Sequence, residues 1–256
     1  MASSSPKVDL DDVHKAFGSK VILRGLTLRI PAGQSLVIIG GSGTGKSVLL
    51  KHIIGLLQPD RGTVHVDGVD LSSLGRRALT TFRQRFGMAF QEGALFDSMT
   101  VAENIAFPLR RAGNRDRATI DDRVETCLDL VNLEGIGDKL PSQLSGGMRR
   151  RVGFARAIAL EPEILLFDEP TTGLDPVMTA VIDGVITGMR ARSTKPVTTI
   201  TITHDMASAF RIADRIAMLH QGQIIADAEP EAFRTLDDPR VQQFIAGDAA
   251  GPLNAD

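Results

Sequence analysis

Cysteine is scarce in this sequence, and two aromatic residue types are absent. Its 256 residues include one cysteine, Cys127, and neither tryptophan nor tyrosine. A single cysteine excludes an internal disulfide and a zinc site built from several cysteines, and it fits a reducing compartment. Because an unpaired cysteine usually behaves as a small apolar side chain, we expect Cys127 to be at least half-buried on a helix.

An excess of charge and a long apolar run are also missing. The formal net charge is −2 with 23% charged residues, so we expect no nucleic-acid partner. No apolar run approaches the roughly eighteen residues of a membrane span, so any work at a membrane is expected to go through partner proteins. One basic cluster could contact nucleic acid or anionic lipid, but nearby aspartates dilute it and favour a solvated loop. It consists of Arg110, Arg111, Arg115 and Arg117.

The most informative stretch is a glycine-rich segment between a strand and a helix. Residues 35–39 form an apolar run typical of a buried strand, and residues 48–54 have helical apolar spacing. The segment between them matches G-x-x-x-x-G-K-[ST], in which glycines let consecutive N–H groups face a polyphosphate at a helix N-terminus. Kinases, GTPases and motors share this loop, so it predicts nucleotide binding only. Its residues are Gly40, Gly41, Ser42, Gly43, Thr44, Gly45, Lys46 and Ser47.

The order of strands and helices predicts an α/β fold. Short strands over residues 8–30 and 63–68 predict an antiparallel β layer. From about residue 86 onward, strands alternate with helices, which predicts a largely parallel sheet covered on both faces. Residues 216–226 are expected to form a terminal hairpin around Gln221 and Gly222.

Polar side chains follow three later strands of the predicted sheet. Gln91, the pair Asp168–Glu169 and His204 each come at the end of a predicted strand. Each of these residues alone is weak evidence for a site, because glutamine and histidine are often structural and an acidic pair often starts a helix. In parallel sheets, however, ligands bind outside the carboxyl ends of the strands. We therefore expect Asp168 to hold Mg²⁺, Glu169 to activate the attacking water, and His204 to contact the γ-phosphate.

A second anion-binding helix start is predicted at Ser145, Gly146 and Gly147, before the helical stretch 149–160. One nucleotide does not need two such sites in the same chain. The second site therefore favours a two-fold homodimer in which it contacts the nucleotide of the partner copy.

Together these motifs resemble the ATPase subunits of ABC transporters over residues 8–246. The resemblance implies a P-loop NTPase (RecA-like) core with an antiparallel β subdomain and an inserted helical subdomain. The core would comprise residues 8–91 and 160–246, and the helical subdomain residues 92–159. Residues 247–256 would form a tail. We expect residues 245–256 to be mobile because of their glycines and proline, with bracing of the dimer as the alternative.

The resemblance also assigns roles to site residues. It implies ATP and Mg²⁺ as cofactors and integral membrane permease subunits as partners. Phe17 falls where the family has an adenine-stacking aromatic, although a core phenylalanine is the alternative. The implied catalytic residues are Glu169, His204 and Gln91. The implied Mg²⁺ ligands are Ser47, Gln91 and Asp168. The implied ATP contacts are Phe17, the loop 40–47, Ser145, Gly146, Gly147 and Asp175.

Residues that depart from the usual family pattern indicate one group within the family. Met148 replaces a glutamine, and three arginines, 149–151, follow it. With the segments 91–96 and 238–244, these residues are similar to the Mla-type phospholipid transport ATPases, which act with proteins carrying mammalian-cell-entry (MCE) domains. That likeness implies a peripheral location at the cytoplasmic face of the inner membrane. Alternatives are an importer ATPase for a small solute such as an amino acid, and a soluble ABC ATPase outside transport.

Overall fold

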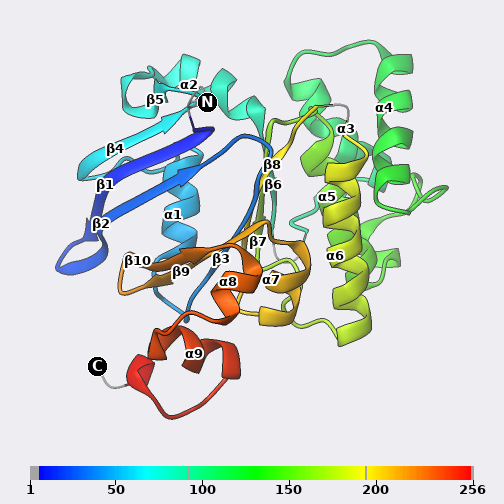
Figure 1. Cartoon of the computed structure of the whole chain (residues 1–256). Coiled ribbons are helices and arrows are strands. Elements are labelled where there is room, and N and C mark those ends of the chain that lie inside the picture. The colour runs from blue at the N-terminus through cyan, green and yellow to red at the C-terminus, as the bar shows by residue number, and fades with distance from the viewer. Residues whose placement is uncertain (1–5, 91–92, 194, 255–256) are drawn as a thin grey trace. The chain divides into compact units, whose positions relative to one another are not determined.

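The computed structural model describes residues 6–90, 93–193 and 195–254. The chain folds as two compact units, which Figure 1 traces from the N-terminus to the C-terminus. Unit 1 comprises residues 1–75 and 202–256, and unit 2 comprises residues 76–201. The predicted helical subdomain falls within unit 2, and its boundaries at residues 92 and 159 stay a prediction.

Unit 1 contains the expected antiparallel β layer. Its strands have the order β2-β1-β4-β5, and Figure 1 shows β2, β1 and β4 running side by side. Val8 and Leu10 of β1 alternate with polar residues, and an irregularity in the pairing between Leu10 and Val13 lets Val13 be fully buried as well. The bounds are β1 Val8–Phe17, β2 Lys20–Ile30, β4 Arg61–Val66 and β5 Val69–Asp70.

Unit 1 also contains the strand that leads to the phosphate loop. Strand β3 (Ser35–Ile39) is buried at all five positions, as expected for a strand covered on both faces. It pairs in parallel with β9 (Arg215–His220), which pairs antiparallel with β10 (Gln223–Ala228). The last two strands confirm the predicted terminal hairpin. Helices α1 (Lys46–Ile53) and α7 (Met206–Ile212) follow β3 and β8 along the chain.

The end of the chain contains two short helices that the sequence analysis did not identify. They are α8 (Pro230–Arg234) and α9 (Pro239–Ala246), each with proline at its first position. The tail, which we expect to be mobile, folds back onto the nearly buried Gln243. The Gln243 side chain donates to the Asp248 carbonyl over 3.1 Å and accepts from the Leu253 N–H over 2.8 Å.

Unit 2 has three strands in the order β8-β7-β6, with helices along the rest of its chain. Strands β6 (Phe86–Ala89) and β7 (Ile164–Asp168) pair in parallel. A Cβ on Gly87 would lie 2.2 Å from the Ala157 carbonyl oxygen, so this glycine lets α5 approach β6 closely. The other bounds are α2 Arg76–Phe82, α3 Val101–Arg111, α4 Arg117–Leu130, α5 Gly146–Ile158, α6 Pro176–Ala191 and β8 Thr198–Ile202.

Two expectations about the helices are confirmed. Cys127 is buried on α4, and burial raises the pKa of its thiol to about 11. The basic cluster surrounds an exposed loop between α3 and α4. None of the helices in the described ranges combines the length and the apolar character that crossing a bilayer requires.

Candidate active site

The phosphate loop of unit 1 takes a backbone shape that only glycine adopts easily. Gly43 and Gly45 have φ values of 77° and 108°, in the region that side chains disfavour. Gly40 packs so closely that a Cβ would lie 2.2 Å from the Leu219 carbonyl oxygen of β9. Helix α1 begins directly after Gly45, so the loop leads directly into a helix N-terminus.

Lys46 supplies the positive charge of this loop. Its ammonium donates to the Gly40 and Gly41 carbonyls over 2.7 and 2.9 Å, so it lies across the loop. Residues 41–43 and Ser47 are exposed. An ammonium and the N–H groups of a helix start fit the phosphates of ATP. The exposed Ser47 hydroxyl is an oxygen ligand of the kind that Mg²⁺ prefers.

Two further predicted residues lie on unit 1. The Thr203 N–H donates to the Ile38 carbonyl over 3.2 Å, which places Thr203 beside the end of β3. The exposed His204 is the next residue in the chain. Phe17 ends β1 and is 49% exposed, which excludes the alternative of a core phenylalanine. Its stacking on adenine stays a prediction. Leu23 of β2 packs against Gly45, where an added Cβ would lie 3.2 Å from its side chain.

The acidic pair lies at the end of β7 in unit 2. Asp168 is the last residue of the strand, and Glu169 follows with a φ of +51°, in the left-handed region. For a residue other than glycine this backbone costs roughly 1–3 kcal/mol, and such strain persists where surrounding contacts hold it. The Glu169 carboxylate accepts a hydrogen bond of 2.8 Å from the Thr172 hydroxyl.

The second predicted anion site also lies in unit 2, at the start of α5. Ser145 caps this helix, its hydroxyl accepting from the Met148 N–H over 3.3 Å. Gly146 is exposed, and a Cβ there would meet nothing within 4 Å. Gly147 packs on α6, where a Cβ would lie 2.5 Å from the Met178 side chain. Asp175 caps α6 through the N–H groups of Val177 and Met178. Its contact with ATP stays a prediction.

The structure groups the predicted site residues by unit. Unit 1 holds Phe17, the phosphate loop and His204, whereas unit 2 holds the acidic pair, the serine-glycine helix start and Asp175. Gln91 lies outside the described residues. Of the three proposed Mg²⁺ ligands, Ser47 therefore lies in unit 1, Asp168 lies in unit 2, and Gln91 is outside the described residues. That the three bind one Mg²⁺ ion together stays a prediction. Among the described residues, no cluster of three histidine, cysteine or acidic side chains could hold a metal.

Arginines of α5 are site-related residues that the sequence analysis did not assign. Arg150 donates to the Pro170 and Thr172 carbonyls in the loop after Glu169. Arg156 donates to the Gly93 and Ala94 carbonyls over 2.9 Å each. The basic run after Met148 marked this helix as unusual, but a run of arginines does not indicate which carbonyl each side chain reaches.

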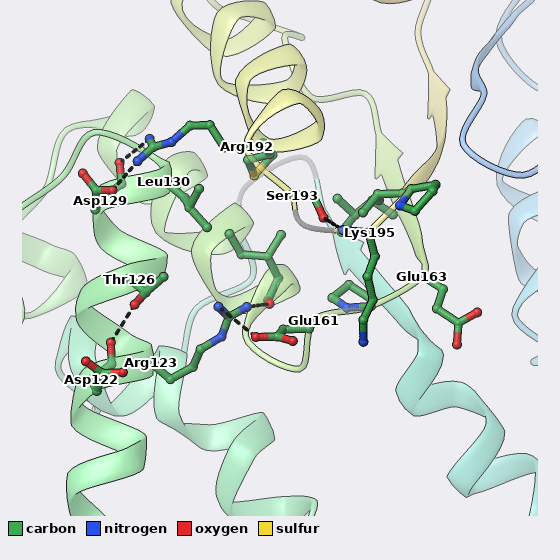
Figure 2. Close-up of a pocket in the computed structure, with 16 residues that line it drawn as sticks. Asp122, Arg123, Thr126, Asp129, Leu130, Glu161, Glu163, Arg192, Ser193 and Lys195 are labelled. Atoms are coloured by element: carbon green, nitrogen blue, oxygen red, sulfur yellow. Dashed lines mark hydrogen bonds and ion pairs between the residues drawn. The ribbon is translucent and has the colours of Figure 1, made fainter.

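A cavity of about 500 Å³ lies elsewhere on unit 2, between α4, α6 and the loop after α5 (Figure 2). None of the predicted site residues lines it. Arg123 extends from α4 toward Glu161 and binds the carbonyls at the end of α5, while Arg192 pairs with Asp129. These arginines are already engaged within the protein, and the cavity has no lining residue in common with the predicted nucleotide site.

The loop, the acidic pair and the two helix starts are the parts of a nucleotide-hydrolysing ATPase. The chain belongs to the ABC transporter family, whose model matches residues 23–172, and it is an ATPase of that family. It is similar to mkl of Mycobacterium tuberculosis, a probable ribonucleotide transport ATP-binding protein. The two are 42% identical over 246 residues, covering 96% of this chain and 68% of mkl.

Two further relatives have names that refer to lipids or to a chloroplast. The intermembrane phospholipid transport ATP-binding protein MlaF of Escherichia coli is 39% identical over 246 residues, covering 96% of this chain and 91% of MlaF. The chloroplastic protein TRIGALACTOSYLDIACYLGLYCEROL 3 of Arabidopsis thaliana is 37% identical over 261 residues, covering 96% and 75%.

Solved structures confirm the predicted fold class. A dimeric bacterial ABC transporter cassette matches with a TM-score of 0.78 and 32% identity, covering 87% of this chain and 98% of the cassette. The protein cbiO1 of Clostridium perfringens, part of an ABC transporter complex, matches with a TM-score of 0.82 and 26% identity, covering 90% and 92%.

Replacing Lys46 with alanine is expected to reduce ATP hydrolysis to background and to weaken ATP binding, because the loop loses the cation that faces the phosphates. Phosphate release and binding of a fluorescent ATP analogue measure the two effects. Lys51→Ala, on the last turn of the same helix, is the matched control and should retain both. Normal hydrolysis in Lys46→Ala would contradict the phosphate contact.

Proposed function

We propose that this ATPase drives phospholipid transport together with integral membrane permease subunits. The supporting observation is the likeness to MlaF, which extends over 96% of this chain and 91% of MlaF. The chain lacks the long coiled-coil insertion, zinc cluster or second cassette expected of a soluble ABC ATPase acting on DNA or ribosomes. A membrane permease is therefore the partner that we propose.

We further propose a homodimer with two ATP molecules at its interface. Each triphosphate would bind the phosphate loop of one copy and the Ser145–Gly147 turn of the other. The supporting observations are the exposure of Ser145 and Gly146 and the open space around Gly146. Since α5 has 13 residues, its N-terminus carries a partial positive charge suited to a phosphate. The dimeric cassette of similar fold supports the same assembly.

In this assembly, the residues of one composite site divide the work of hydrolysis. Lys46 would bind the β- and γ-phosphates, while Ser47, Asp168 and Gln91 would hold Mg²⁺. The bound ion would offset the charge of these phosphates. Glu169 would orient the attacking water and accept its proton, and His204 would contact the γ-phosphate. Phe17 would stack on adenine, and Asp175 would contribute at the interface.

The permease is expected to dock near residues 93–99, beyond Gln91. Phe96 in this segment is 42% exposed and packs against Phe107, with ring centroids 4.8 Å apart. An exposed aromatic supported by a second ring suits a protein interface. We propose a peripheral location at the cytoplasmic face of the inner membrane, and a further partner that carries an MCE domain.

Glu169→Gln is expected to retain ATP binding and to slow hydrolysis roughly 10²- to 10⁴-fold, as for the loss of a general base. Phosphate release from the purified complex gives the rate, and equilibrium binding gives the affinity. Glu134→Gln, an exposed position on unit 2, serves as the control. Hydrolysis at a near-normal rate in Glu169→Gln would remove Glu169 from the catalytic role.

Gly146→Asp tests the composite site. In a Glu169→Gln background, ATP is expected to produce a stable dimer, and the added carboxylate should abolish it by repelling the partner's phosphates. Binding of ATP to the monomer should persist, because a Cβ at this position meets nothing within its own chain. Light scattering after size exclusion measures the mass. Gly184→Asp, at an exposed helical glycine with equally open surroundings, should leave the dimer intact.

Isolation of the chain from native membranes tests the lipid assignment. We expect a multi-spanning permease, an MCE-domain protein and bound phospholipid to copurify with it, identified by mass spectrometry. A permease accompanied by a receptor for an amino acid or ribonucleotide, without bound lipid, would instead support a solute importer. Recovery of ribosomes or DNA in place of a permease would contradict both transport functions.

A further inference from the structure

Arg150 links helix α5 to the loop that carries Glu169. Its guanidinium donates one hydrogen bond of 2.9 Å to the Pro170 carbonyl and a second one to the Thr172 carbonyl. The loop is held from within by a bond from the Leu174 N–H to the Thr171 carbonyl over 3.1 Å. The planar guanidinium is suited to holding two acceptors at a fixed separation, which a lysine cannot do equally well.

The same loop determines where the Glu169 carboxylate lies. Glu169 has a left-handed backbone that a residue without special support does not favour, and its Oε2 atom accepts from the Thr172 hydroxyl over 2.8 Å. Thr172 is thus bonded on two sides, with its carbonyl on Arg150 and its hydroxyl on Glu169. A change in the position of Arg150 would therefore move Thr172, and through Thr172 it would move the Glu169 carboxylate.

Neighbouring arginines on α5 bind elsewhere, because successive helical residues point about 100° apart. Arg149 donates to the Leu144 carbonyl, just before α5. Arg151 donates to the carbonyls of Val131 and Asn132, after the end of α4. Of these three arginines, only Arg150 is shown to bond to the loop after Glu169. The run therefore includes one residue that binds the loop after the acidic pair and two that bind other segments.

We infer that Arg150 is a positioning residue that aligns the Glu169 carboxylate for hydrolysis and couples this alignment to the placement of α5. This inference rests on the proposed function, in which Glu169 accepts the proton of the attacking water. Because the N-terminus of α5 would contact the partner's ATP, closure of the dimer would act directly on the position of α5. The same helix holds the Glu169 loop through Arg150. Each copy would then orient its own base as it engages the partner's nucleotide.

The first test compares Arg150→Met with Arg151→Met in the purified complex. Methionine keeps much of the stem and removes every donor. Arg150→Met is expected to lower kcat for ATP about tenfold or more, with KM within about twofold, because orientation of the base matters mainly in the transition state. Arg150→Lys should recover part of kcat. Arg151→Met should lower the melting temperature by about as much as Arg150→Met does. Its kcat, however, should stay within about twofold of the wild-type value.

A double-mutant cycle with Glu169→Gln separates positioning from an independent effect. If Arg150 acts through Glu169, Arg150→Met should change the residual rate of Glu169→Gln by less than about twofold. Loss of the same factor in both backgrounds would overturn the inference. Thr172→Val, which removes the hydroxyl at nearly constant volume, provides a second variant if Arg150→Met does not fold. It should lower kcat at unchanged KM, and a normal kcat would overturn the inference.

The outcomes distinguish this inference from the proposed function. If Glu169→Gln alone hydrolyses ATP normally, then the role of Glu169 is wrong and the inference fails with it. If Glu169→Gln is inactive whereas both Arg150→Met and Thr172→Val keep a normal kcat, then only the positioning role fails.

Discussion

The close approach of backbone to backbone around the phosphate loop is the constraint on which the candidate site in unit 1 depends. Gly40 lies where any side chain would collide with the Leu219 carbonyl, and Gly45 lies against β2 as α1 begins. The loop can therefore present its N–H groups only if β3, β9 and β2 are already in place. Strand β3, buried at all five positions, supplies the rigid support for this arrangement.

In unit 2, helix α5 has the corresponding role. Its N-terminus carries the serine-glycine turn, its middle contacts the loop after Glu169 through Arg150, and Arg156 binds the carbonyls of residues 93 and 94. Gly153 allows the last of these contacts to be close, since a Cβ there would lie 2.7 Å from Gly93. A shift of this helix would affect all three segments at once, and under the proposed function such a shift would couple nucleotide, base and permease.

Motifs that depend on local chemistry were predictable from the sequence. The glycine spacing before Lys46 identified the phosphate loop, and apolar runs identified the strands that end at Asp168 and near His204. The short helices α8 and α9 were missed, because five and eight residues give too little periodicity to detect. The fold-back of the tail onto Gln243 was missed as well. That contact depends on hydrogen bonds that composition does not indicate.

The sequence by itself determined the ATPase motifs, the α/β class and the membership of a transporter family, because these follow from residue types at fixed short spacings. The tertiary structure decided which side chains lie around the predicted catalytic residue. The two contacts of Arg150 join α5 to a loop about twenty positions later. Within that loop, Glu169 has a left-handed backbone and accepts a hydrogen bond from Thr172. Contacts between distant segments form only when packing brings those segments together, so they cannot be predicted from residue types at short spacings.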